Sequence, residues 1–266
     1  MTTVWTAIAL TTLAGAATAI GAAAAFAARR TNTGLLSVSL GLSGGVMIYI
    51  SFVSLLSDAN NALAEVWGKP QGNLAAMSAF FTGMLLAFLI DQIVPDTVNP
   101  HLTKGVEDLS QDADNSQLKR MGLITALAMA LHKLPEGIAV FASGMHSAEL
   151  GIPVAIAMAL HNIPEGIAVS VPIYYATGSR KTAFFWASLT GLADPAGALI
   201  GWAVLLPFIK AFPQMLSLIN AAVAGIMIFV TFDGLLPMAQ KFGKPHWSLA
   251  GIISGMFIMA LALALI

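Results

Sequence analysis

The segments LHKLPEGIAV, at residues 131–140, and LHNIPEGIAV, at residues 160–169, are near-copies of each other. Extended by two residues at the start, they agree at ten of twelve positions. Each copy places a histidine four residues before a glutamate, so on a helix both side chains lie on one face, one turn apart. The repeat therefore predicts two helices that present the same pair of polar groups.

The composition indicates that lipid is the solvent of this chain. Of its 266 residues, 58% are hydrophobic and 9% are charged, whereas soluble domains carry roughly a quarter charged residues. The net charge of −1 gives no reason to expect a nucleic-acid partner. The absence of cysteine excludes disulfides, thiolate metal sites and cysteine nucleophiles.

Eight stretches reach the roughly 20 apolar residues that a membrane-spanning helix needs, and they use nearly the whole chain. We therefore expect an all-α, polytopic membrane protein in which residues 1–266 form a single transmembrane domain. The longest polar connector is the loop at residues 96–120. The predicted spans are Val4–Ala28, Leu35–Ser57, Leu74–Val94, Met121–Met145, Ile152–Tyr175, Ala183–Leu206, Met215–Pro237 and Trp247–Ile266.

The basic residues between the spans predict the orientation. One set of alternate loops carries nine of them, whereas the opposite set carries only Lys69 and Lys210. Because cytoplasmic loops are enriched in Lys and Arg, we expect both termini to be extracytoplasmic and the loop at residues 96–120 to be cytoplasmic. That loop is acidic and contains His101, which fits a solvated connector or a weak metal-delivery segment. The nine residues are Arg29, Arg30, Lys104, Lys119, Arg120, Arg180, Lys181, Lys241 and Lys244.

The twin segments predict a metal site near the middle of the membrane. A short loop separates their spans, so the helices run antiparallel and are related by an axis in the membrane plane. Their pairing would bring together His132, Glu136, His161 and Glu165. Ionisable groups at that depth cost about 2.5–3.5 kcal/mol each, and a divalent cation would compensate them. Imidazole with carboxylate suits zinc, iron, manganese or cobalt, and calcium less well. The alternative is a purely structural pairing of His with Glu.

Other polar residues within the predicted spans are also candidates for the site. Asp194 precedes Pro195 in the sixth span and is expected to be a further ligand, as is the amide oxygen of Asn162. Lys133 occupies the position that matches Asn162 in the other copy. Its ammonium group either pairs with Glu136, three residues on, and stands in for a second cation, or extends into an aqueous cavity.

HKLPEG and HNIPEG on consecutive spans resemble the twin motif of the ZIP (Zrt/Irt-like) family of divalent-metal transporters, particularly its bacterial members. The similarity extends to GVMIYIS at residues 45–51, to YYATGSRKTAFFWASLTGLAD at residues 174–194, and to NAAVAGIMIFVTFDGLLP at residues 220–237. It therefore covers nearly the whole chain.

This resemblance implies eight helices in a three-two-three arrangement with inverted halves, in a cell membrane. It implies that divalent metal is a transported substrate, not a cofactor, and that the protein is no enzyme. Metal would move toward the cytoplasm by alternating access, as the first, fourth, fifth and sixth helices shift against the others. The central ligands would be His132, Glu136, His161 and Glu165, and an adjacent position would use Asn162 and Asp194 while sharing Glu136 and Glu165.

Four positions depart from the usual pattern of that family. Lys133 replaces a common Asn, and Asp194 replaces a common Glu. Ser54 and Gly234 stand where many relatives have Glu. These departures argue against a second bound metal and remove two carboxylates from the pathway. Asp58, Asp91 and Asp233, which lie toward span ends, are either pathway carboxylates or interfacial residues.

Two alternatives from other functional classes are intramembrane proteases. The string Gly41-Leu42-Ser43-Gly44 fits the GxSG pattern of rhomboid-like serine proteases, but no histidine outside the twin segments lies mid-membrane to act as the base. A metalloprotease could use the same His and Glu residues, yet the HExxH pattern is absent. The small residues of the first span permit close packing within one protomer or between two, so a homodimer also stays open.

Overall fold

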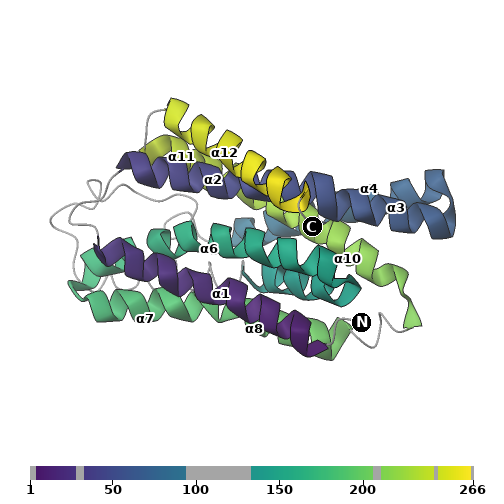
Figure 1. Ribbon diagram of the computed structural model, residues 1–266, viewed down its shortest axis with the longest axis horizontal. Helices are drawn as coiled ribbons and strands as arrows, with labels where there is room; N and C mark the ends of the chain where they lie inside the picture. The colour runs from purple at the N-terminus through teal and green to yellow at the C-terminus, as the bar shows by residue number, and fades with distance from the viewer. Residues whose placement is uncertain (1–3, 28–32, 94–132, 206–210, 243–244, 265–266) are drawn as a thin grey trace.

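The computed structural model describes the chain except for residues 1–3, 28–32, 94–132, 206–210, 243–244 and 265–266 (Figure 1). In the described part, seven helices are long and apolar enough to cross a membrane. Residues 133–146 are also helical and form the described part of the fourth predicted span. The all-α, polytopic membrane fold is thereby confirmed, while His132 and the loop at residues 96–120 lie outside the described residues.

Several helices follow one another without a gap, which gives helical spans longer than predicted. The second span consists of α2, η1 and α3 and runs to Trp67. Only Gly68, with φ of 81°, separates it from the next helix, which begins at Lys69. Three turns in the described residues, η1, η4 and η5, are π-helical, a feature often found near functional sites. The elements are α1 Val4–Ala27, α2 Thr33–Ile50, η1 Ser51–Leu55, α3 Leu56–Trp67, α4 Lys69–Ile93, α6 Ala148–Thr177, α7 Arg180–Gly191, α8 Ala193–Ile200, η4 Gly201–Leu205, α10 Gln214–Val230, η5 Thr231–Leu235, α11 Leu236–Phe242 and α12 Pro245–Ala264.

The two helices that carry the twin segments form a tight hairpin. Ser147 alone separates residues 133–146 from α6, and its side chain caps α6 by accepting a hydrogen bond from the Leu150 amide at 3.1 Å. At the other end, Gly178 adopts a left-handed conformation with φ of 63° and closes the helix. Because a single residue reverses the chain, the twin segments run antiparallel, as predicted.

The helices form two groups (Figure 1). The α1 group consists of α1, α6, α7 and α8 with residues 133–146, and the α2 group consists of α2, α3, α4, α10, α11 and α12. Within the α2 group, α2 packs against α12 and α10 packs against α4. The second of the first three spans (α2) therefore packs against the last of the last three spans (α12). The second of the last three spans (α10) packs in the same way against the third span (α4), which is the pairing expected of inverted halves. The largest buried apolar cluster lies between the groups, where Ala139 and Val140 join Met47 and Val223.

Glycines set the close approach of these helix pairs. A Cβ atom at Gly45 of α2 would run into the carbonyl oxygen of Ile252 on α12. In the related pair, a Cβ atom at Gly83 would run into the carbonyl oxygen of Ala222, and one at Gly225 into that of Phe80. Small residues are known to let helix backbones approach closely in membranes.

The small residues of α1 pack within the protomer. A Cβ atom at Gly15 would run into the carbonyl oxygen of Gly191, and one at Gly21 into that of Ile163. The opposite side of α1 exposes Trp5, Leu13 and Ile20 at 61–74% of their surface. Close packing inside one chain therefore accounts for the glycines of the first span.

We expect Gly225→Ala to destabilise the protein by about 1–3 kcal/mol, because the added methyl group meets backbone that cannot move aside without separating α4 from α10. The measurement is thermal unfolding in detergent, followed by circular dichroism. Gly44→Ala is the matched control, since its nearest neighbours are side-chain atoms of Leu236 and Thr231 at 3.1 and 3.3 Å. Equal destabilisation by both variants would contradict this account of the packing.

Candidate metal site

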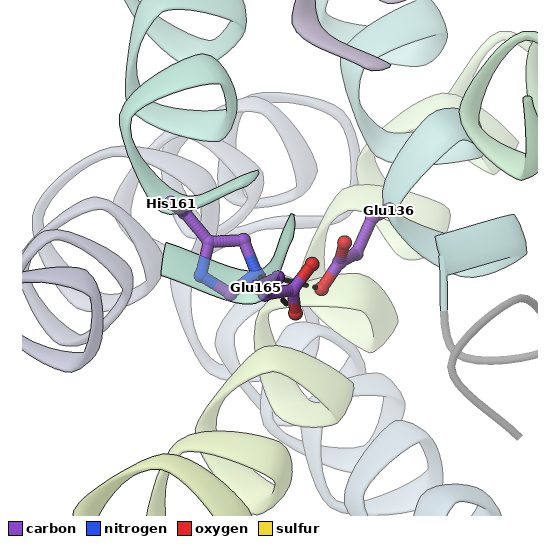
Figure 2. A group of neighbouring side chains, drawn as sticks. All are labelled: Glu136, His161 and Glu165. Carbon is purple, nitrogen blue, oxygen red and sulfur yellow. Dashed lines mark ion pairs between the residues drawn. The ribbon is translucent and has the colours of Figure 1, made fainter. Parts of the chain in front are cut away.

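Three predicted ligands meet between the two helices of the hairpin (Figure 2). His161 and Glu165 lie one turn apart on α6, and Glu136 reaches them from the helix at residues 133–146. The Nε2 atom of His161 lies 2.9 Å from Glu165 Oε1 and 3.4 Å from Glu136 Oε1. One donor atom from each residue falls within 4.8 Å of the others. The geometry thus brings together three of the four predicted central residues, and the fourth, His132, lies outside the described residues.

This group is buried. The exposed fractions of Glu136, His161 and Glu165 are 1%, 0% and 2%. Two carboxylates in such a place are costly unless a cation compensates them. An imidazole nitrogen and two carboxylate oxygens are ligands that zinc and similar divalent ions accept.

Lys133 supplies one cation beside this group. Its Nζ atom lies 2.6 Å from Glu165 Oε2 and 3.7 Å from Asp194 Oδ2, and it donates a hydrogen bond to Asn162 Oδ1. The side chain is fully buried, so the alternative that it extends into an aqueous cavity is wrong. The sequence indicated a pairing of Lys133 with Glu136, its neighbour on the same helix, and the structure adds ion pairs with residues of α6 and α8.

The amide of Asn162 is oriented by three partners. Its Nδ2 atom donates to the carbonyl oxygen of Ala14 on α1 at 2.8 Å and to Asp194 Oδ2 at 2.9 Å. Because both of these partners are acceptors, the amide oxygen must face Lys133, which can only donate. The oxygen that the sequence offered to a metal is therefore engaged by an ammonium group.

A break between α7 and α8 positions Asp194. Leu192 interrupts the helix, so Asp194 and Pro195 lie in the first turn of α8, in the middle of the span Arg180–Val204. A Cβ atom at Gly137 would run into the carbonyl oxygen of Asp194. That close approach brings the start of α8 against the helix that carries Lys133 and Glu136.

The ionisable side chains of the site carry a net negative charge. Glu136, Glu165 and Asp194 contribute three negative charges when ionised, and Lys133 contributes one positive charge. With His161 neutral, two negative charges remain, which one divalent cation would balance. This group of side chains therefore has the net charge and the ligand types to bind one divalent ion beside the ammonium group of Lys133.

Sequence reasoning missed one contact of the site. The hydroxyl group of Ser43, on α2, forms a hydrogen bond with Nδ1 of His161. In the sequence, Ser43 stands out only as part of the GxSG string of a serine protease. The other ring nitrogen of His161, Nε2, faces two carboxylates, so the hydrogen bond fits a histidine that is oriented to bind metal. The position of Ser43 next to Gly44 and Gly45 was the available signal, because small residues mark close helix contacts.

The remaining acidic residues do not join the group in the described part of the chain. Ser54 donates to Asp58 at 3.1 Å, and Asp58 is exposed. Asp91 lies near the end of α4 and Asp233 lies in η5, both partly buried. Whether they line a pathway stays a prediction.

Known proteins resemble this chain over nearly its whole length. The family model described as ZIP Zinc transporter matches residues 95–263. The zinc transporter ZupT of Akkermansia muciniphila is 51% identical, and the match covers 96% of this chain and 95% of the relative. The proteins of the same name from Streptococcus mutans and Oceanobacillus iheyensis are 49% and 52% identical, and the matches cover at least 97% of this chain and 96% of each relative. These likenesses favour transport over either protease alternative.

We expect Lys133→Met to destabilise the protein by about 3–5 kcal/mol, because it leaves buried carboxylates without their cation. Thermal unfolding in detergent with a metal chelator present measures the effect. Lys181→Met removes an exposed lysine at the start of α7 and is the control. If the two variants unfold at the same temperature, the ion pairs of Lys133 do not stabilise the fold.

Proposed function

This chain belongs to the ZIP family of zinc transporters, and we propose that it carries zinc through the site of His132, Glu136, His161 and Glu165. Transport of divalent metal ions across the membrane is the function of the chain. The observation that supports the site is the buried group of Glu136, His161 and Glu165, whose donor atoms lie within 4.8 Å of one another. The other three metals that suit such ligands, iron, manganese and cobalt, and also cadmium, are further candidate substrates.

We propose that one metal ion binds per protomer. Asn162 and Asp194 would serve as ligands of a second cation position, which the ammonium group of Lys133 fills in this chain. The contacts of Lys133 Nζ with Asn162, Glu165 and Asp194 support this. One ammonium group and one divalent ion balance the three carboxylates, whereas a second divalent ion would add surplus positive charge.

The direction and the mechanism are also proposals. The excess of Lys and Arg in alternate loops supports extracytoplasmic termini and a cytoplasmic loop at residues 96–120. The division into an α1 group and an α2 group supports alternating access, in which one group shifts against the other and metal moves inward. We further propose that residues 1–266 act as one transporter domain in a cell membrane, without catalytic activity, either as a monomer or as a homodimer.

We expect the double variant His132→Ala, His161→Ala to reduce zinc uptake into liposomes to the background of protein-free liposomes, because half of the donor atoms are lost. His146→Ala is the control, because it removes an exposed histidine at the end of the helix at residues 133–146. Competition with iron, manganese, cobalt and cadmium in the same assay ranks the substrates. Unchanged uptake by the double variant, with the wild type active, would reject the site.

We expect the purified wild type to bind one zinc ion per protomer and Lys133→Asn to bind two, because the asparagine frees Glu165, Asp194 and Asn162 for a second ion. Equilibrium dialysis with elemental analysis of the protein fraction counts the ions. The double variant Lys133→Asn, Asp194→Asn should return the count to one. Equal counts in the wild type and Lys133→Asn would show that Lys133 does not occupy a metal position.

A further inference from the structure

Ser43 and His161 link the two helix groups at the metal site. Ser43 lies on α2, and its hydroxyl group forms a hydrogen bond with Nδ1 of His161 on α6. Both residues are fully buried. The other ring nitrogen, Nε2, faces Glu165 and Glu136 at 2.9 and 3.4 Å. The α2 group therefore contacts the imidazole ring at Nδ1, and the carboxylates of the α1 group contact it at Nε2.

We propose that Ser43 is a positioning residue that makes His161 a strong metal ligand only while α2 and α6 stay docked. The inference rests on the proposed function. A nitrogen that binds metal must offer its lone pair, so metal at Nε2 requires the proton to be on Nδ1. The Ser43 oxygen then accepts the hydrogen bond from Nδ1–H and stabilises the metal-bound form of the ring. Without Ser43, the buried Nδ1–H group loses its acceptor, which weakens the metal-bound form.

The location of the bond couples metal affinity to the docking of the groups. A hydrogen bond is lost once its atoms separate beyond about 3.5 Å, so a shift of α6 along α2 by even part of one helical turn, about 5.4 Å, breaks it. The site would then hold metal tightly in the docked arrangement and release it more readily after the shift. Groups that orient a metal-binding histidine commonly contribute 10–100-fold to metal affinity.

The test compares Ser43→Ala with a matched control on the same helix. Ser37 is also buried on α2, and it donates its hydrogen bond to the carbonyl oxygen of Ala239, away from His161. We expect Ser43→Ala to weaken zinc binding in detergent roughly tenfold or more, and Ser37→Ala to leave it unchanged. In a His161→Ala background, Ser43→Ala should have no further effect, since its partner is gone. An equal loss in both backgrounds, or no loss in the wild-type background, would overturn the inference.

Transport kinetics and spectroscopy separate positioning from simple packing. In liposomes, Ser43→Ala should raise KM for zinc about as much as it raises Kd, with the maximal rate per folded protein unchanged or higher, because release no longer requires the bond to break. In the zinc-bound protein, nitrogen NMR of labelled histidine should show a hydrogen-bonded Nδ1–H group of His161 in the wild type and a shifted Nδ1 resonance in Ser43→Ala. A lower maximal rate with unchanged KM, or identical spectra, would reject the proposal while wild-type uptake leaves the transport function intact.

Discussion

The burial of three carboxylates in one place is the constraint on which the rest of this structure depends. Glu136, Glu165 and Asp194 are at most 2% exposed, so bulk water does not solvate their charge. Each oxygen therefore needs a cation or a donor. Lys133 and Asn162 supply part of that requirement, and the charge that remains suits a divalent ion. In the proposed metal site, a divalent ion would complete the charge balance of these buried residues.

Close helix packing makes this arrangement possible. Glycines at the helix contacts remove the methyl groups that would hold the backbones apart, as Gly137 does against Asp194 and Gly166 does against Thr18. Three separate segments, α6, α8 and residues 133–146, thereby deliver side chains to a single point. The same small residues leave little room for rearrangement within a group, which favours movement of one group as a unit against the other.

Lys133 in the first twin segment breaks the symmetry of the repeat at a position that could otherwise supply a metal ligand. In the second segment, the equivalent residue is Asn162, a neutral amide that can ligate a cation. In the first, a tethered ammonium group is itself the cation, and it engages that amide directly. A permanent charge held by the chain does not leave with the substrate, so Glu165 and Asp194 remain partly neutralised when no metal is bound.

The sequence by itself determined the membrane fold, the antiparallel hairpin and the pairing of Glu136 with His161 and Glu165, because hydropathy and residue spacing are properties of neighbouring positions along the chain. For Lys133 it left two alternatives open, one of which made its ammonium group a stand-in for a second cation. Only the tertiary structure decided that Glu165 and Asp194 hold Lys133, that the Asn162 oxygen faces it, and that Ser43 contacts His161. These contacts join residues 29 to 118 positions apart. Their proximity follows from how whole helices pack, which no local pattern encodes.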